Sequence, residues 1–417
     1  MLKDSLQILK YREFNLFLFA RFFITLAIQM QMSTIYLQVY YEYYKGDELA
    51  LGLIGLAEII PFIVVSFFSG HVADTVSRRS ILLLGSVALF FGSLFLFTFS
   101  SNAITFFKPA GALALFSVVV SFGVIRSFLS AATQPFMSQL TPRNLYVQAA
   151  TWNSTVWHTG AILGPVLAGL IYGFNNGKHA DWCYVINCIL FLMTFLFFLL
   201  IKPKSIPVRE KNETLMESLS SGLKFVYKNN MILSALSLDL FAVLFGGAIA
   251  IVPAFTDKIL HLGPEAYGLL RTAPAIGAVI TSFFLAFRQP GKRAGFDLLW
   301  TVAAFGVCTI LFALCTNYWM AFAMLLLTGV FDNVSVVIRQ TVLQLMTPDN
   351  MRGRVSAVNN IFVGSSNEIG AFESGALAKL IGLVPSIIFG GAMTVVVVGA
   401  VNKLNPDLKK LDLSKIE

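Results

Sequence analysis

The sequence predicts an all-α polytopic membrane protein in which twelve transmembrane helices form two pseudo-symmetric six-helix bundles. The first reason is composition: 57% of the 417 residues are hydrophobic and 12% are charged, whereas a soluble protein carries about 25% charged residues. The second reason is a series of apolar segments of about 20 residues, the length that crosses a bilayer as a helix. The third is an internal repeat. Together they disfavour a large soluble helical protein.

Twelve apolar segments follow one another, six on each side of a polar stretch. They lie near 14–44, 49–70, 80–100, 110–137, 149–173, 181–201, 231–256, 264–287, 296–316, 318–345, 354–378 and 383–401. The expected organisation is an N-terminal bundle over 1–201, a linker over 202–230, a C-terminal bundle over 231–401 and a tail over 402–417.

The distribution of positive charge predicts the orientation of these segments. Loops on one side hold roughly four times as many Lys and Arg as loops on the other, and basic residues accumulate on the cytoplasmic side. Both termini, the linker and the tail are therefore expected in the cytoplasm. The net charge of +8 then reflects topology and indicates no nucleic-acid partner. The polar start MLKDSLQILKYREF has no A-x-A-like cleavage site, so we expect the first helix to be retained.

The linker contains one segment with helical periodicity, TLMESLSSGLKFVYKN. Thr214 and Glu217 have the spacing of a capping box at its start. An apolar face follows, made of Leu215, Leu219, Leu223 and Val226. This pattern predicts a short amphipathic helix that lies on the membrane surface and connects the two bundles.

The two halves of the chain resemble each other in sequence. With a shift of 206 residues, LTPRNLYVQAATWN (140–153) aligns with MTPDNMRGRVSAVNN (346–360) and keeps Thr-Pro-x-Asn. The same shift places Gly164 on Gly370 and Gly169 on Gly375. A shift of 216 aligns VVSFF with ITSFF. Apolar segments can align by chance. Thr-Pro-x-Asn, however, is polar and keeps the same register as the downstream glycines, which favours a true repeat.

Parallel six-helix repeats of this kind are typical of the major facilitator superfamily, and two motifs strengthen the resemblance. GHVADTVSRRS resembles the superfamily's signature between spans 2 and 3, with Thr75 and Ser77 departing from it; the matching positions are Gly70, Asp74, Arg78 and Arg79. GAILGPVLAGL resembles the exporter motif of span 5; the matching positions are Gly160, Gly164, Pro165 and Gly169. Residues 351–378 resemble the bacterial branch that includes the enterobactin exporter and macrolide-efflux-like proteins.

The resemblance implies a cytoplasmic latch at the first motif. Membrane topology by itself accounts for Arg78 and Arg79, but Asp74 contributes little to orientation. The resemblance implies that Asp74 meets the start of span 11, where Arg352 and Arg354 lie and a helix N-terminus favours a carboxylate. The alternative is that Asp74 is an ordinary loop residue.

Ionisable residues inside the spans are costly and usually functional. A carboxyl at that depth favours its neutral form unless a cation pairs with it, so it is suited to carry a proton. The candidates for proton coupling are Glu368, Asp332, Glu58, Arg126 and Glu373. Arg126 enters by resemblance to an arginine in span 4 of antiporters, although Leu129 and Ser130 depart from that motif. The alternative is permanent ion pairs with Arg21, Arg271 or Arg339, which also fall within spans, as does Asp239.

Other residues are candidates for packing or for lining a lipophilic cavity. The small residues at Gly160, Gly164 and Gly169 permit close helix approach, and Pro165 bends its helix. The cavity candidates are Tyr36, Tyr40, Trp157, His158 and Phe331. Packing inside the bundle or contact with lipid is the alternative for each of them.

These features predict a secondary active transporter, a proton-coupled exporter of small amphipathic, drug-like or siderophore-like molecules that works by alternating access. A flippase or facilitator for a lipid-like substrate is the alternative, and a membrane receptor or enzyme is the alternative outside transport. The chain has no P-loop, GxSxG or HExxH motif, so we expect no enzymatic activity and no cofactor. No metal-ligand spacing involves its cysteines, which are Cys183, Cys188, Cys308 and Cys315. The expected partners are the substrate, protons and lipid, with a monomer in a bacterial inner membrane.

Overall fold

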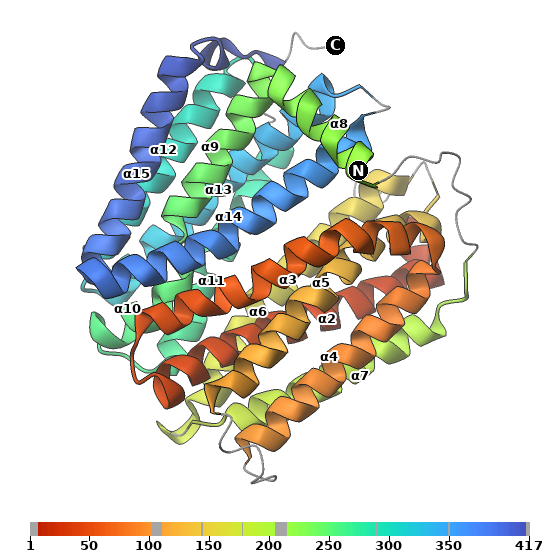
Figure 1. The fold of residues 1–417 in the computed structure, drawn as a ribbon, viewed down its shortest axis with the longest axis vertical. Coiled ribbons are helices and arrows are strands. Elements are labelled where there is room, and N and C mark those ends of the chain that lie inside the picture. Colours follow the sequence, from red (N-terminus) through yellow and green to blue (C-terminus); the bar gives the residue numbers. More distant parts are fainter. Residues whose placement is uncertain are drawn as a thin grey trace. The chain divides into compact units, whose positions relative to one another are not determined.

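The computed structural model describes residues 7–101, 111–142, 145–176, 178–204, 215–287, 291–348 and 351–413. Within these ranges the chain forms helices and no β-strand, which confirms the predicted class (Figure 1). The helices form two compact units. Unit 1 comprises Met1–Lys45, Ile60–Asn212 and Gly263–Leu269, and unit 2 comprises Gly46–Ile59, Glu213–Leu262 and Leu270–Glu417.

Unit 1 is built around its first long helix. α2 packs against α6 and α7, while α4 packs against α5 and α7. Its helices are α2 (Arg12–Gln38), α4 (Arg78–Ser100), α5 (Ala112–Leu140), α6 (Tyr146–Tyr172), α7 (Ala180–Leu200) and the second part of α3 (Glu48–Thr75). A π-helical turn over Val39–Tyr43 extends α2. These residues are helical because each segment is apolar and long enough to satisfy its own backbone hydrogen bonds within a bilayer.

Unit 2 contains the remaining long helices, with α12 packed against α13 and α15, and α9 packed against α14 and α15. They are α8 (Leu215–Lys228), α9 (Asn230–Gly246), α10 (Val252–Lys258), α11 (Pro264–Phe287, from Leu270), α12 (Ala294–Ala313), α13 (Tyr318–Met346), α14 (Arg352–Ile381) and α15 (Leu383–Leu404). The first part of α3 also belongs to this unit.

The helices reproduce the twelve predicted spans. Eleven in the described part of the chain are long and apolar enough to cross a membrane. The twelfth span, predicted over 354–378, corresponds to α14, which has 30 residues and is longer than a span requires. Its asparagine, serine and glutamate side chains lower its hydropathy, so length marks it as a span more clearly than composition does.

The seventh span is broken, whereas the sequence predicted one continuous helix over 231–256. α9 ends at Gly246, a 3-10 turn covers Ala248–Ile251, and α10 begins at Val252. Gly247 leaves the helical conformation with φ −70° and ψ 42°, and Pro253 at the start of α10 has no N–H to continue the ladder. Non-helical backbone at membrane depth is tolerated where it is buried in protein or lines a cavity.

The connection between the second and third spans is shorter than the predicted loop over 70–80. α3 continues to Thr75 and α4 begins at Arg78, so Gly70 lies within α3 rather than in a loop. Arg79 donates from Nε to the carbonyl of Phe198 (3.1 Å) and from Nη2 to that of Leu199 (2.8 Å). Its guanidinium therefore caps the C-terminus of α7, where a positive charge and a hydrogen-bond donor are both favourable.

The linker helix is present as α8, but it packs on protein. Residues 205–214, including the predicted cap Thr214, lie outside the described part of the chain. Val226 is buried and Leu223 is 37% exposed, while the side chains of Leu215 and Leu219 lie outside the described structure. A Cβ at Gly222 would lie 2.9 Å from the carbonyl oxygen of Arg354, and Arg354 Nη1 donates to Ser221 (3.1 Å). α8 is thus attached to the start of α14.

The tail after α15 is also packed. The backbone N–H of Gly295, at the start of α12, donates to the carbonyl of Leu411 (3.2 Å), and the N–H of Leu413 donates to the carbonyl of Gly291 (3.2 Å). Leu408, Leu411 and Leu413 are all buried. These leucines and backbone bonds hold the tail against the loop before α12.

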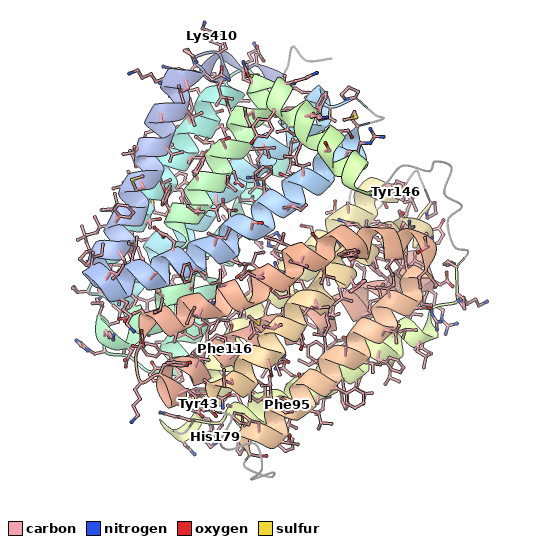
Figure 2. The ribbon with its side chains drawn as sticks, in the orientation of Figure 1. Tyr43, Phe95, Phe116, Tyr146, His179 and Lys410 are labelled. Carbon is pink, nitrogen blue, oxygen red and sulfur yellow. The ribbon has the colours of Figure 1, made fainter. Side chains whose placement is uncertain are left out.

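Aromatic side chains gather at one end of unit 1. Tyr43 stacks on Phe99 with ring centroids 6.1 Å apart, and His179 stacks on Trp182 at 4.7 Å. Figure 2 shows Tyr43, His179 and Phe95 at the same end of this unit. Tyrosine and tryptophan are enriched where a membrane protein meets the bilayer interface, and this cluster has that character.

Glycines set the closest helix contacts of unit 1. A Cβ at Gly164 would lie 2.6 Å from the Cβ of Gln29 and 2.8 Å from the backbone nitrogen of Met30, so α6 lies directly on α2. A Cβ at Gly169 would lie 2.8 Å from the Cα of Gly268, in the first turns of α11. The glycines assigned to the exporter motif therefore occupy positions where a larger side chain has no room.

We predict that Gly164→Leu lowers the stability of the protein, because its side chain would overlap α2. Overpacking of this kind costs about 1–3 kcal/mol. Thermal unfolding of the purified protein in detergent measures the effect. Gly399→Leu is the matched control, since no atom lies within 4 Å of a Cβ there. Equal midpoints for the two variants would contradict the packing described for α6.

Candidate functional site

A small cavity inside unit 2 contains a carboxylate. Its volume is about 90 Å³, which is room for several water molecules. It lies beside the break between α9 and α10, and α11, α12, α13 and α14 complete its wall. Its polar lining consists of Asp332, Asn367, Thr309 and Thr328; the apolar and backbone lining comprises Val243, Gly246, Gly247, Ile249, Pro274, Phe305, Leu325 and Gly329.

Close packing of α13 on α11 places Asp332 at this cavity. Gly329 lies against the backbone of Pro274, and a Cβ at Gly277 would lie 2.9 Å from the nitrogen of Val330. Residues three apart share a helix face, so Asp332 lies one turn beyond Gly329 on the packed side of α13. The carboxylate of Asp332 has no hydrogen-bond or ion-pair partner among the described residues.

The nearest arginine on the same helix is already paired. Arg339 of α13 forms an ion pair with Asp239 of α9, and their side chains are 2% and 6% exposed. A buried guanidinium requires such a counter-charge, because desolvation of an unpaired ion costs several kcal/mol. A structural ion pair was one of the interpretations of Arg339 from the sequence, and the structure shows Asp239 as its partner. Because Arg339 is paired with Asp239, it does not provide a counter-charge for Asp332.

Two further carboxylates lie on α14, and both face protein. Glu368 is half-buried, and its Oε2 lies 3.3 Å from the position that a Cβ of Gly55 would occupy. Glu58, one turn after Gly55 on α3, is 3% exposed. Oε1 of Glu373 is buried without a hydrogen-bond partner in the described structure, while Oε2 is 3.5 Å from the hydroxyl of Ser374.

The contact between α14 and the first part of α3 is close and is tied at one end by ion pairs. A Cβ at Gly375 would lie 2.8 Å from the nitrogen of Gly52. Lys379 Nζ lies 2.6 Å from Asp47 Oδ2, and Lys258 Nζ of α10 lies 2.5 Å from Glu48 Oε1. The lysines are almost half exposed, so each pair contributes little stability by itself. The glycines, more than the charges, fix Glu368 beside α3.

In unit 1, Arg126 lies over an aromatic ring. Its Cζ is 5.4 Å from the centroid of Phe62, a distance typical of a cation–π contact.

Arg21 of α2 was not among the predicted site residues. It has no hydrogen-bond or ion-pair partner in the described part of the chain, and its Nε is buried. The sequence signal was its position inside a span.

Polar groups on α6 are also unsatisfied. The atoms concerned, buried and without a hydrogen-bond partner in the described structure, are Gln148 Oε1, Asn153 Oδ1 and His158 Nδ1. The ring of His158 makes an edge contact with Trp157, whose side chain is 39% exposed. Gly160 of α6 lies at the level of Thr25 on α2, so this polar segment runs beside the turn of α2 that carries Arg21.

The expected aromatic cavity is only partly present. Tyr36 and Tyr40 are 4% and 1% exposed, so their rings are packed inside unit 1 instead of lining an open cavity. Trp157 and His158 remain accessible on α6, and Phe331 is half-buried on α13. The presence of a tyrosine in a span does not by itself indicate whether its ring is packed in the bundle or lines a cavity.

The residues of the expected latch have other partners or lie outside the described structure. The side chains of Asp74 and Arg352 lie outside the described structure. Arg78 Nη1 donates to the carbonyl of Pro135 (3.4 Å), and Arg354 donates to Ser221. Together with the capping role of Arg79, these contacts give the arginines structural roles within their own units.

The described residues contain no group of three or more His, Cys, Asp or Glu side chains placed to hold a metal ion. The four cysteines are free thiols, three of them buried and Cys188 half-buried. The chemistry available at the candidate site is therefore that of carboxylates, hydroxyls and amides around a small cavity. Such groups bind protons and hydrogen-bonding molecules.

We predict that Asp239→Asn destabilises the protein by about 3–5 kcal/mol, because it leaves Arg339 buried without a counter-charge. Adding Arg339→Gln should recover most of the loss. Thermal unfolding in detergent compares these variants with Asp407→Asn, which removes an ion pair whose side chains are more than 70% exposed. A single Asp239→Asn variant that unfolds like Asp407→Asn would mean that the buried pair is not structural.

Comparison with known proteins identifies the fold. The chain superposes on a POT family transporter in complex with a thioalcohol-conjugated peptide, with a TM-score of 0.72, 13% identity and coverage of 96% of this chain and 97% of the other. It also superposes on a bacterial homologue of the human lysosomal transporter Spinster, with a TM-score of 0.71, 14% identity and coverage of 96% and 98%. At such identities the likeness establishes the fold.

Sequence relatives are transporters. The Staphyloferrin A transporter of Staphylococcus aureus is 22% identical over 86% of this chain and 88% of its own length. The Multidrug efflux pump Tap of Mycolicibacterium fortuitum is 21% identical over 89% and 90%. The uncharacterized MFS-type transporter YfmI of Bacillus subtilis is 23% identical over 62% of this chain and 66% of its own length.

The family model described as transmembrane secretion effector matches residues 44–416, which is most of the chain. Its match agrees with the helical fold, with the transporter relatives and with the motifs around Gly70 and Gly160. The chain belongs to this family of transporters within the major facilitator superfamily.

Proposed function

We propose that the protein is a proton-coupled exporter of small amphipathic molecules that works by alternating access in a bacterial inner membrane, with both termini in the cytoplasm. Similarity to the Staphyloferrin A transporter, to the Multidrug efflux pump Tap and to the Enterobactin exporter EntS of Shigella flexneri supports the substrate class. The carboxylate of Asp332, which lines a small cavity without a counter-charge, is the observation that carries the proposal.

The protonation state of Asp332 and the presence of water in its cavity would be coupled. The ionised carboxylate needs water or a cation, because burial disfavours charge, whereas the neutral acid tolerates a dry cavity. Protonation therefore favours a state in which the cavity is closed, and deprotonation favours one in which water enters. A group that interacts differently with two conformations shifts their equilibrium, which is the requirement for coupling.

Asp332 takes precedence over Glu368, another of the five candidates from the sequence. Glu368 lies against Gly55 in a close helix contact, and its carboxylate has interactions in the structure. Glu373 is a second candidate because its Oε1 is buried and unsatisfied. In this proposal Asp332 binds the transported proton. Glu368 and Glu373 on α14 influence how the proton reaches and leaves it.

Arg21 would supply the complementary charge for the substrate. It is a cation within a span of unit 1 and has no anionic partner among the described residues. Polar atoms of Asn153 and His158 on the adjacent α6 are also unsatisfied. An amphipathic molecule that carries an acidic group for Arg21 and a hydrogen-bond donor for the amide oxygen of Asn153 would satisfy these atoms, and a neutral apolar molecule would not.

We predict that Asp332→Asn abolishes proton-driven export while leaving exchange without a gradient intact, because asparagine resembles the protonated acid and cannot release a proton. Transport of a substrate identified by compound screening, in proteoliposomes with and without a pH gradient, measures both activities. Asp297→Asn, at the start of α12, is the control for loss of a carboxylate in the same unit. If Asp332→Asn still responds to the gradient as the wild type does, Asp332 is not the coupling residue.

We predict that Glu373→Gln and Glu368→Gln alter the pH dependence of export to different degrees. The amide at position 373 removes an unsatisfied buried carboxylate, so the variant should fold and its export should respond less to pH. Glu368→Gln keeps the shape that packs on Gly55 and should preserve folding. Export rates over a series of internal and external pH values test this. Unchanged profiles for both variants would restrict proton coupling to residues outside α14.

A further inference from the structure

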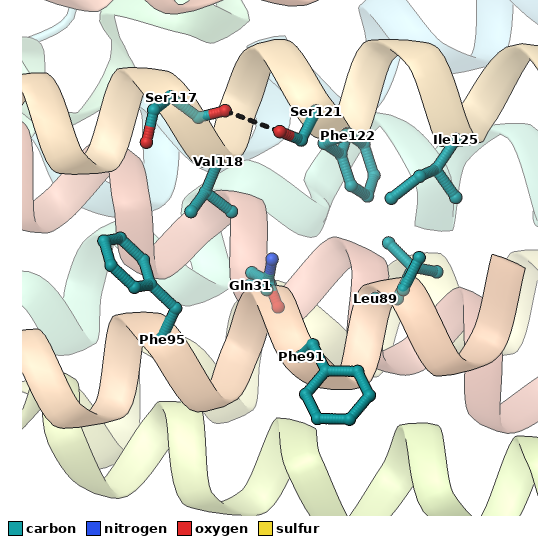
Figure 3. Close-up of a pocket in the computed structure, with 11 residues that line it drawn as sticks. Gln31, Leu89, Phe91, Phe95, Ser117, Val118, Ser121, Phe122 and Ile125 are labelled. Atoms are coloured by element: carbon teal, nitrogen blue, oxygen red, sulfur yellow. Dashed lines mark hydrogen bonds between the residues drawn. The ribbon is translucent and has the colours of Figure 1, made fainter.

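Unit 1 contains a larger pocket that the proposed proton site does not use. It lies between α4 and α5 with a volume of about 460 Å³ (Figure 3). This volume is within the range of small-molecule sites, which extends over about 300–1,000 Å³. The wall is mainly apolar and comprises Ala88, Leu89, Phe91, Gly92, Phe95, Val118, Phe122 and Ile125, with Ser117, Ser121 and Gln31 as its polar residues.

Gln31 of α2 forms the base of the pocket and has one unused polar group. Its side chain is 1% exposed. Its Oε1 accepts a hydrogen bond from the hydroxyl of Ser93, whereas its Nε2 has no acceptor among the described residues. Figure 3 shows the amide nitrogen directed toward α5, into the space between Val118 and Phe122. An amide N–H that opens into a pocket without an acceptor leaves a hydrogen bond unmade, so a ligand or a water molecule would complete the site.

The two serines on the wall do not supply that acceptor. Ser121 donates to the carbonyl of Ser117 (2.9 Å), and Ser117 donates to the carbonyl of Ala114 (2.8 Å), so both hydroxyls are directed along α5. Among the lining residues Phe91 is 59% exposed, and Ser117 and Ser121 are exposed as well. A hydrocarbon chain would fill the volume and leave the amide of Gln31 unpaired.

We propose that this pocket binds an amphipathic molecule whose apolar body contacts Phe95, Phe122 and Ile125 and whose carbonyl accepts a hydrogen bond from Gln31 Nε2. A lipid ester and a transported amphiphile share this chemistry. The inference concerns binding in unit 1 and does not require proton coupling at Asp332. The amide of Gln31 gives the site its preference for a carbonyl over plain hydrocarbon.

A pair of photoreactive probes tests the proposal. Full-length protein in nanodiscs is labelled with a diazirine-bearing dodecanoate methyl ester or with the corresponding alkane, and labelled peptides are identified by mass spectrometry. The ester is expected to label α4 and α5 at the pocket about fivefold more than the alkane does, the effect of one hydrogen bond. Equal labelling by the two probes would overturn the role of Gln31.

Two variants separate the pocket from the amide. A Cβ at Gly92 would lie 3.6 Å from Val118 Cγ1, so Gly92→Leu extends into the pocket without a clash and should block labelling by both probes. Gln31→Leu should reduce ester labelling to the level of the alkane. Gly399→Leu, in open space on α15, is the control and should label like the wild type. Wild-type labelling of a folded Gly92→Leu variant would overturn the site.

Competition and export assays identify the source of the ligand. If excess phosphatidylethanolamine suppresses ester labelling and Gly92→Leu exports normally, the occupant is a membrane lipid. If the screened substrate suppresses labelling and Gly92→Leu loses export in both the presence and the absence of a pH gradient, the occupant is the substrate. A failure of proton coupling would appear only in the gradient-driven assay, so the two proposals fail separately.

Discussion

The cost of placing a charge where water is excluded determines how unit 2 is arranged. Arg339 and Asp239 meet this cost together, since each provides the counter-charge of the other. Asp332, two turns earlier on the same helix as Arg339, has no such partner among the described residues and lies at a small cavity instead. The pairing of Asp239 with Arg339 thus leaves Asp332 at the cavity without a counter-charge among the described residues.

Close helix contacts give these charges fixed positions. Gly329 allows α13 to approach Pro274 of α11, which brings Asp332 to the cavity wall. The break at Gly247 contributes the facing wall, because the chain turns away from the helix axis there. Gly55 allows α14 to approach α3 at Glu368. Gly329 and Gly55 each lie three positions before a carboxylate, Asp332 and Glu58, so packing and chemistry are set there by the same stretch of sequence.

Hydropathy, length and charge distribution were sufficient to predict the class of fold and the twelve spans. They were insufficient at the seventh span, because Gly246 and Gly247 are compatible with a helix until the packing around them is known. The same limitation applies to the loop at Arg78, where the helices extend into a segment with polar composition. Local patterns report propensity, whereas helix ends depend on which groups cap them.

The candidate site was predictable as a set of residue types and less so as an arrangement. Asp332, Glu368 and Glu373 were identified because carboxylates are rare in spans. Their ranking depended on partners that lie far away in sequence, such as Asp239 for Arg339 and Gly55 for Glu368. Gln31 was missed because an amide in a polar stretch of a span carries no charge, and only the pocket around it indicates a role.

Infrared difference spectroscopy of the purified protein tests the central claim directly, because it detects protonated carboxyl groups without a substrate. Spectra are recorded from mildly acidic to alkaline pH for the wild type and for Asp332→Asn. The account predicts a carboxylic acid band that disappears on alkalinisation in the wild type and is missing from the variant. Identical difference spectra for the two proteins would show that Asp332 does not hold the exchangeable proton.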